Sequence, residues 1–275
     1  MRNKKNFILA VLIVSLIIIC AGCSKSGTPA SSLPETQSPA ETESPAASET
    51  PEPENTPMPE PSPAETQAPV KLSETEDMGQ EYQDKIVFYG DSNTNRLRLT
   101  EILPGAYRTG QIWTPMSGTL TLSFWNTTTV VYPETWTEMH VTEAMKLKKP
   151  EYLLINLGSN GISFMDETAF KNEYRKMVTA LKEANPETKI MLSGLYPVAN
   201  SYPYQKDINN NKIAAANEWI YSIAEETGTR YIDSGEALRA ADNSLPEDMH
   251  TGDGYHLSKQ SLELVLKYIR THAYQ

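Results

Sequence analysis

The sequence predicts an α/β domain built on a doubly wound, mainly parallel sheet. Four short apolar runs are continuous rather than alternating, as in strands that are buried on both faces, and they cover residues 86–89, 152–155, 190–192 and 231–232. Amphipathic stretches with helical spacing lie between them. Because strands then alternate with helices along the chain, we expect parallel pairing with short right-handed connections.

Two of the helices reveal their buried face through the spacing of apolar residues. These residues are Phe170, Tyr174, Met177 and Leu181 in the first helix and Ile213, Ala216, Ile220 and Ile223 in the second. Gly228 follows the second helix, and Pro150 and Pro186 lie just after others, where stop signals are expected. A last helix carries Leu262, Val265, Leu266 and Ile269. In such a sheet, a ligand binds beyond the carboxyl ends of the strands.

The first 23 residues have the layout of an export signal. Arg2, Lys4 and Lys5 precede 16 uncharged residues, fewer than the about 20 that a membrane span needs. The ending Cys20-Ala21-Gly22-Cys23 resembles a bacterial lipobox, although Cys20 stands where Leu is usual. This resemblance implies cleavage and lipidation of Cys23, with an uncleaved signal anchor as the alternative. Either way, we expect the rest of the chain at the cell surface, on the extracellular face of the cytoplasmic membrane.

Residues 24–79 have the composition of a disordered tether. They hold 11 of the chain's 19 prolines and no aromatic residue, so they cannot bury enough apolar surface to offset the entropy lost on folding. Residues 80–275 are the right size for one compact domain, which we expect to be monomeric. Both cysteines lie in the leader, so this domain must fold without an intrachain disulfide. The net charge of −11 argues against nucleic-acid binding.

Polar residues follow three of the predicted strands or turns. Ser92, in Gly90-Asp91-Ser92, is either a helix N-cap or a nucleophile at a helix N-terminus, where the dipole favours an oxyanion. Asn160, between Gly158 and Gly161, either supports a left-handed turn or donates a hydrogen bond into the cleft.

The third polar group comes near the end of the chain. Asp253 precedes His256 by three residues, so its carboxylate can accept from Nδ1 of the imidazole and leave Nε2 to take a proton from a serine. Surface turn chemistry is the alternative. His140, His250 and His272 lack a comparable partner, and we expect them on the surface or on helix faces.

Taken together and in this order, the motifs GDS at 90–92, GxN at 158–160 and DxxH at 253–256 resemble the blocks of the SGNH or GDSL hydrolases. The resemblance spans residues 84–272. It implies a flavodoxin-like three-layer α/β/α sandwich, usually with five parallel strands, and esterase or acyl-hydrolase chemistry that needs no metal or organic cofactor.

The resemblance also implies roles for individual residues. Ser92 is the nucleophile, His256 the general base and then acid, and Asp253 the residue that orients His256. The oxyanion hole consists of the backbone N–H groups of Ser92 and Gly110 and the side-chain amide of Asn160. Gly105 and Gly118 compete with Gly110 for this role, and Gly161 stands where the family commonly has Asp.

Other hydrolase chemistries lack their motifs. The sequence has no GxSxG elbow, no HExxH zinc motif and no GxxxxGK[ST] phosphate loop. The resemblance implies a serine esterase, and many members of the family remove acetyl groups from carbohydrates. Because the tether would hold the enzyme among wall polymers, we expect it to remove acetyl or other short acyl groups from a carbohydrate or wall glycan. The alternatives are a lipid or short-chain esterase, an O-acyltransferase on the same triad, and a non-catalytic surface module that binds glycan or a wall protein.

Aromatic residues in the predicted loops are the candidates for sugar contact. They are Trp113, Trp125, Trp136, Tyr202 and Tyr204, although core or loop packing is the more common role for such residues. The segment 196–207, with two prolines and three tyrosines, is the best single candidate for substrate contact.

Overall fold

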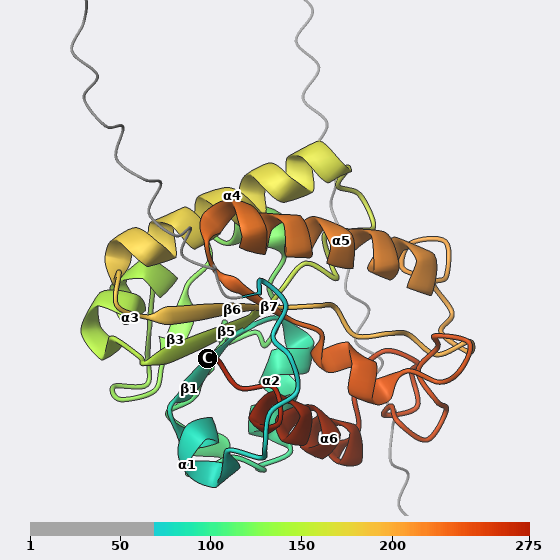
Figure 1. The fold of residues 1–275 in the computed structure, drawn as a ribbon, viewed down its shortest axis with the longest axis horizontal. Helices are drawn as coiled ribbons and strands as arrows, with labels where there is room; N and C mark the ends of the chain where they lie inside the picture. The colour runs from blue at the N-terminus through green and yellow to red at the C-terminus, as the bar shows by residue number, and fades with distance from the viewer. Residues whose placement is uncertain (1–68) are drawn as a thin grey trace, which may run out of the picture. The chain divides into compact units, whose positions relative to one another are not determined.

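The computed structural model of the protein describes residues 69–275, which contain a five-stranded sheet (Figure 1). Its strands are all parallel and lie in the order β2 (Ile112–Trp113), β1 (Ile86–Gly90), β5 (Tyr152–Asn156), β6 (Lys189–Ser193) and β7 (Arg230–Ile232). This is the flavodoxin-like order, and the predicted fold class is confirmed.

The strand order determines where a site can form. After β1 the chain crosses to β2 at one edge of the sheet and then returns to β5 on the other side of β1. The carboxyl ends of β1 and β5 therefore flank the topological switch point, where open α/β sheets bind their ligands. Ser92 and Asn160 lie just beyond these two strand ends.

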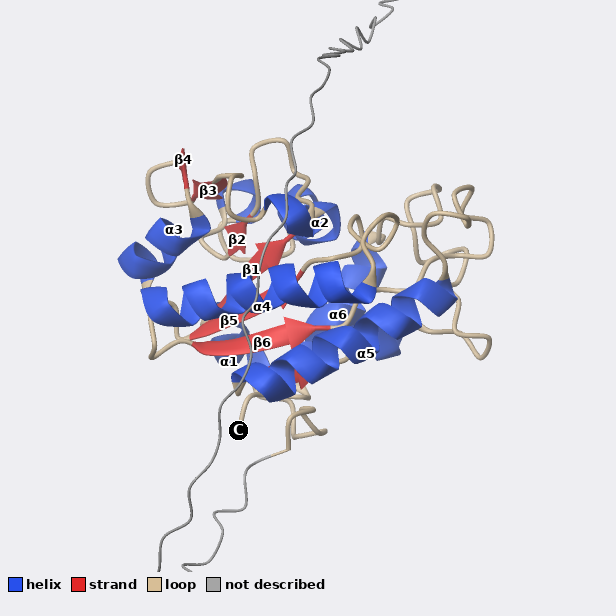
Figure 2. Cartoon of the chain, turned by 90° about the horizontal axis from the view of Figure 1, so that it is seen from above, coloured by secondary structure: helices blue, strands red, loops and turns tan. Residues whose placement is uncertain are grey.

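Helices cover both faces of the sheet (Figure 2). Val87 and Tyr89 of β1 belong to the core that contains α3 (Val141–Lys148), α4 (Glu167–Ala184) and α5 (Asn210–Thr227). Ile86 and Phe88 point the other way, into the core with α1 (Gly79–Asp84), α2 (Ser92–Leu99) and α6 (Lys259–Arg270). Since both faces are covered, all five residues of β1 are buried, as the continuous apolar run predicts.

The apolar faces and ends of the long helices are those that the sequence predicts. All eight spaced residues of α4 and α5 are buried, as are the four of α6. Asp166, Asn209 and Ser258 cap the three helices by accepting a backbone N–H of the first turn. Gly228 ends α5 with φ of +63°, the left-handed conformation expected there.

Several short elements escape sequence analysis. The strand β2 has two residues, too few to show a pattern. A separate hairpin of β3 (Val130–Tyr132) and β4 (Thr137–Met139) and three 3₁₀ turns, η1 (Ala106–Arg108), η2 (Leu122–Phe124) and η3 (Ser234–Leu238), fill the connections. Trp136 turns the hairpin, and the Arg108 guanidinium lies 4.3 Å from the centre of its ring.

The domain begins earlier than the expected boundary at residue 80. Backbone hydrogen bonds of 2.8 Å join Val70 and Leu72 to Tyr231 of β7, and Leu72 is buried. Two apolar residues suffice to continue the sheet edge, although the segment around them has the composition of a linker. The leader, Cys23 and most of the expected tether lie outside the described residues. None of the helices in residues 69–275 is both long and apolar enough to cross a membrane.

Candidate active site

Ser92 is the first residue of α2, directly beyond the carboxyl end of β1. The turn is tight, because a Cβ at Gly90 would collide with the carbonyl oxygen of Asn156 and the hydroxyl of Thr94. The N-cap is Asp91, whose carboxylate accepts the backbone N–H of Asn93 at 3.1 Å. Since the capping role belongs to Asp91, the hydroxyl of Ser92 is free for other contacts.

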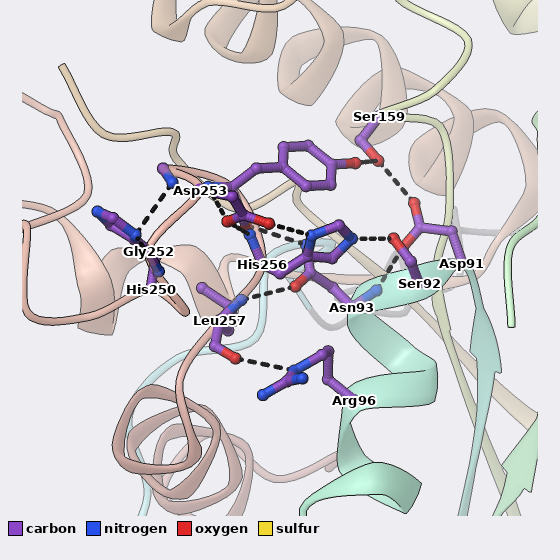
Figure 3. A network of polar contacts seen from close by, with 12 residues as sticks. Asp91, Ser92, Asn93, Arg96, Ser159, His250, Gly252, Asp253, His256 and Leu257 are labelled. Carbon is purple, nitrogen blue, oxygen red and sulfur yellow. Dashed lines mark hydrogen bonds and ion pairs between the residues drawn. The ribbon is translucent and has the colours of Figure 1, made fainter. Parts of the chain in front are cut away.

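That hydroxyl meets an imidazole from the far end of the chain (Figure 3). The Oγ of Ser92 lies 2.9 Å from Nε2 of His256, and Nδ1 of His256 lies 2.6 Å from Oδ2 of Asp253. The structure thus brings Ser92 together with His256 and Asp253, which follow it by more than 160 positions, in the order serine, imidazole, carboxylate.

The electrostatics of Asp253 favour this arrangement. Burial raises the pKa of Asp253, but hydrogen bonds from the His256 ring and from the backbone N–H groups of Tyr255 and His256 outweigh it and lower the pKa to about 2. The carboxylate is therefore ionised at neutral pH and accepts Nδ1–H of His256. The lone pair of Nε2 then faces the Ser92 hydroxyl, as a general base requires.

Side chains of α2 hold the His256 loop against the helix that begins with Ser92. Asn93 accepts the backbone N–H of Leu257 at 3.0 Å and donates to the carbonyl of Tyr255 at 3.5 Å. Arg96 donates to the carbonyl of Leu257 at 3.2 Å. Sequence analysis missed both residues, because nothing in a helix sequence shows which loop will pack against it.

A buried chain of hydrogen bonds runs from the Asp91 carboxylate, next to Ser92, to the hydroxyl of Ser159 (Figure 3). Asp91, which is 1% exposed, accepts a hydrogen bond from Ser159 at 2.6 Å, and Ser159 in turn accepts from the Tyr255 hydroxyl at 2.6 Å. Burial raises the pKa of Asp91, and the hydrogen bonds from Ser159 and Asn93 oppose that rise. This chain joins the starts of the turns that carry Ser92, Asn160 and His256.

Asn160 lies on the same cavity as Ser92. Its Nδ2 donates one hydrogen bond, of 2.9 Å, to the carbonyl of Leu120, which leaves the second N–H of this amide for a ligand. The left-handed position of the turn is Gly158, with φ of +132°, where a Cβ would come within 2.7 Å of Phe170. Asn160 is therefore not required for the turn geometry.

The structure contradicts the assignment of Gly110. Ile112 pairs with Phe88, so Gly110 is level with Ile86 at the amino end of β1, while Ser92 lies beyond the opposite end. Six residues of strand correspond to about 20 Å. Gly110 lines a different cavity, with Lys85 and Lys148. The error arises because a two-residue strand cannot be located in the sequence. The sequence therefore does not show whether a glycine precedes or follows β2.

Of the two competing glycines, Gly105 also precedes β2, whereas Gly118 follows it. The N–H of Gly118 donates to the carbonyl of Pro115 at 2.8 Å, and its φ is +75°. The next residue, Thr119, lines the cavity with Ser92. The loop after β2 thus reaches the site through Thr119.

The cavity has a volume of about 790 Å³ and opens beside the Ser92 hydroxyl. Its lining consists of polar and aromatic residues together with a glycine, a proline and an isoleucine: Ser92, Thr119, Asn160, Ser201, Tyr202, Pro203, Tyr204, Ile208, Gly252, Asp253, Tyr255 and His256. None of these described residues is a lysine or arginine. The cavity wall therefore offers hydrogen bonds and aromatic surface, without the cationic side chain of a lysine or arginine.

The segment 196–207 contributes to the cavity wall, through residues 201–204. Tyr202 stacks on Tyr255 with ring centroids 5.6 Å apart, and Tyr204, a residue that is 62% exposed, lies edge-on to Tyr202. Trp113 and Trp125 are instead buried in the core, and Trp136 packs under Arg108. Of the five aromatic candidates, only the two tyrosines line the cavity.

Comparison with known proteins agrees with this geometry. Residues 88–261 match the GDSL-like lipase/acylhydrolase family. The chain belongs to this family. The predicted relationship to the SGNH/GDSL hydrolases is confirmed, and the protein is a carboxylic ester hydrolase. No curated protein matches the chain.

Solved structures have a similar fold. A proposed platelet activating factor from Streptococcus pneumonia matches with a TM-score of 0.51 and 18% identity, over 69% of this chain and 84% of that one. A proposed acylhydrolase from Bacteroides fragilis matches with a TM-score of 0.50 and 17% identity, over 70% of this chain and 94% of that one.

This GDSL-like hydrolase differs from the family pattern at Gly161. A Cβ there would lie 3.0 Å from the sulfur of Met165 and 3.2 Å from the carbonyl oxygen of Gly158, so the turn leaves little room for a side chain. Ser159 supports the turn from its other side, through Asp91 and Tyr255. The turn that carries Asn160 is thus held in place without the acidic residue.

The expectation that His250 lies on the surface of this hydrolase is wrong. His250 was expected on the surface without a partner, but its side chain is 5% exposed and its Nε2 lies 3.0 Å from Oε2 of Glu247. His272 stacks on Tyr268, with ring centroids 3.7 Å apart. His140 immediately precedes α3.

Proposed function

We propose that the protein is a serine esterase in which Ser92, His256 and Asp253 form and hydrolyse an acyl-enzyme. The contact of 2.9 Å between Ser92 Oγ and His256 Nε2 carries this proposal. Nε2 removes the hydroxyl proton as Oγ attacks the ester carbonyl, and the imidazolium then protonates the departing alcohol. In the second half, Nε2 takes a proton from water, the hydroxide attacks the acyl-enzyme, and Ser92 recovers its proton.

The oxyanion of each tetrahedral intermediate lies at the N-terminus of α2. The first N–H groups of a helix have no intrahelical acceptor, and the helix dipole favours negative charge there. We assign the Ser92 N–H and the free N–H of the Asn160 amide as donors. One such donor is worth about 10² to 10³ in turnover.

The cavity favours a neutral substrate with a short acyl group on a carbohydrate. A phosphate or carboxylate beside the ester would meet the Asp253 carboxylate and find no lysine or arginine in the described cavity wall. Tyr202 and Tyr204 offer ring faces and edges, and Ser201, Thr119 and Asn160 offer hydrogen-bonding groups, which together suit a sugar. We therefore place O-acetylated polysaccharide or wall glycan ahead of lipid.

The location follows from the leader. Lipidation of Cys23 would hold the enzyme on the extracellular face of the cytoplasmic membrane, among wall glycans. Residues 70–72 run parallel to β7, so the chain enters the domain from the amino ends of the strands. Ser92 lies beyond the opposite, carboxyl ends of the strands.

Two assays test the proposal. The full chain should release p-nitrophenol from p-nitrophenyl acetate, and Ser92→Ala should abolish this turnover. A non-catalytic glycan-binding module would show no turnover with either protein. Acetate release is then compared on acetylated xylan, acetylated peptidoglycan, small sugar acetates and short-chain lipid esters.

The panel separates the remaining candidates. Preference for a neutral acetylated glycan supports the proposed substrate class, and preference for lipid esters contradicts it. Transfer of acetyl to an added sugar in preference to water identifies an O-acyltransferase. Radiolabelled cells should carry the lipid on Cys23, and Cys23→Ser should remove it.

A further inference from the structure

The loop that carries Asp253 and His256 is organised by a second histidine, His250. Nδ1 of His250 accepts the backbone N–H groups of Gly252 at 2.9 Å and Gly254 at 3.0 Å. Because Nδ1 accepts, the ring carries its proton on Nε2, which donates to Glu247 at 3.0 Å. His250 is thus held as one neutral tautomer in a site that encloses its ring.

The two N–H groups that His250 binds lie on either side of Asp253 (Figure 3). Gly252 and Gly254 have φ of +102° and +77°, so the backbone turns sharply before and after the carboxylate. A hydrogen bond of 2.9 Å from the N–H of Thr251 to the carbonyl of His256 closes the same loop. The orientation of Asp253 therefore depends on what occupies the centre of the loop.

The same unit reaches the cavity wall. Glu247 accepts the hydroxyl of Ser201 at 2.6 Å as well as Nε2–H of His250. The carbonyl of Gly254 accepts the N–H of Ala199 at 2.8 Å. The His250 loop and the segment that presents Tyr202 are thus tied together at two points.

We propose that His250 is a positioning residue for ester hydrolysis. Its Nδ1 fixes the backbone on both sides of Asp253, and this directs the Asp253 carboxylate to Nδ1 of His256. The inference rests on the proposed roles of Ser92, His256 and Asp253. It adds a requirement that these roles do not contain: a hydrogen-bond acceptor at the position of Nδ1 in residue 250.

Two substitutions separate this requirement from bulk and polarity. In His250→Asn, the amide oxygen takes nearly the position of Nδ1 and can accept both N–H groups. In His250→Gln, the amide lies near the position of Nε2, and the two N–H groups lose their acceptor. His272→Asn and His272→Gln repeat the changes at a histidine that contacts neither the loop nor the cavity.

We expect His250→Asn in the full chain to keep most of the wild-type kcat on p-nitrophenyl acetate. We expect His250→Gln to lose about 10²-fold, the effect of displacing a catalytic group by about 1 Å. The loss falls on kcat rather than KM, because Asp253 acts on His256 and not on the substrate. Both His272 variants should match the wild type. Thermal melting shows that each variant is folded at the assay temperature.

A measurement on the wild-type protein keeps the inference testable if a variant does not fold. Two-bond proton–nitrogen NMR spectra should show His250 with its proton on Nε2, and the His250→Asn spectrum identifies its signals. A His250 ring with its proton on Nδ1 overturns the inference, as does equal kcat in folded His250→Asn and His250→Gln. An inactive wild-type protein contradicts the proposed function itself, whereas an active one with equal variants contradicts only the role of His250.

Discussion

Two carboxylate–histidine pairs with the same spacing lie in succession near the end of the chain, Glu247 with His250 and Asp253 with His256. They use their imidazoles in opposite orientations. In His256, Nδ1 faces the carboxylate and Nε2 meets the Ser92 hydroxyl. In His250, Nε2 faces the carboxylate and two backbone N–H groups saturate Nδ1.

The difference shows what sequence spacing can specify. Each carboxylate precedes its histidine by three residues and each pair forms a hydrogen bond, although sequence analysis expects no partner for His250. The chemical role depends on the group that meets the other nitrogen. For His256 that nitrogen meets a hydroxyl in a cavity, and for His250 it meets two backbone N–H groups, so His256 is the one of the two placed to exchange a proton with a substrate.

The strongest test makes the same substitution in both pairs. His256→Asn removes the base that faces Ser92 and should lower kcat by about 10⁶-fold. His250→Asn keeps an acceptor for the loop and should retain most of the activity. Initial rates on p-nitrophenyl acetate measure both. Comparable losses in the two variants would contradict the different roles assigned to His256 and His250.

The two carboxylates form the next comparison. Asp253→Asn should lower kcat by about 10⁴-fold, because the amide favours the wrong tautomer of His256. Glu247→Gln should lower it by less than about tenfold, since Glu247 is exposed and solvent screens exposed ion pairs. Steady-state kinetics on the two variants check this, and the reverse order of losses would mean that Glu247, not Asp253, supports the base.

Asn160 tests the cavity side of the comparison, because His256 and Asn160 line the same cavity and His250 does not line it. Asn160→Ala should fold and lose about 10² to 10³ in kcat, the usual effect of one oxyanion donor. Circular dichroism checks the fold, and kinetics check the loss. Full activity would remove Asn160 from the mechanism.

Asn93 tests how the His256 loop is held from outside, in contrast to the internal support that His250 provides. Asn93→Ala leaves the buried N–H of Leu257 without its acceptor and should lower the free energy of unfolding by about 1 to 3 kcal/mol. Asn211→Ala, on the exposed face of α5, should change it by about 0.5 kcal/mol or less. Urea unfolding measures both. Equal stability of the two variants would show that the hydrogen bonds of Asn93 to the His256 loop contribute nothing to folding.

The smallest expected effect concerns acid pH. Hydrogen bonds from the His256 ring and from the backbone N–H groups of Tyr255 and His256 outweigh burial and lower the pKa of Asp253 to about 2, from an ordinary value of 3.8. The ionised carboxylate therefore stabilises the fold above about pH 4. This contribution disappears as the pH falls to about 2. The Ser201 hydroxyl and His250 likewise lower the pKa of Glu247. Melting temperatures of the wild type and Asp253→Asn should therefore converge between pH 5 and pH 2. A constant difference would contradict the lowered pKa.

The sequence predicts the parts of this molecule that pattern and order determine. Continuous apolar runs predict β1, β5 and β6 because both faces of the sheet are covered. The triad residues are predictable because each follows a strand or turn and each matches a family motif. Ser92 lies beyond the carboxyl end of β1, and the loop before α6 brings His256 to within 2.9 Å of it.

Other parts depend on contacts that have no local signal. Gly110 was misassigned because β2 has only two residues, and the role of Thr119 in the cavity wall follows from that strand. Leu72 lies in a segment with the composition of a linker, and only the structure shows that it pairs with β7. His250 has the same spacing to a carboxylate as His256, and only the folded loop reveals which of its nitrogens faces the backbone.

Labelling with a fluorophosphonate tests the central claim most directly, because this probe reacts with a serine only when a base activates it. Peptide mapping of the labelled full chain should find the probe on Ser92, with labelling abolished in Ser92→Ala and strongly slowed in His256→Asn. A probe attached to another serine, or undiminished labelling of His256→Asn, would contradict an acyl-enzyme formed by Ser92 and His256.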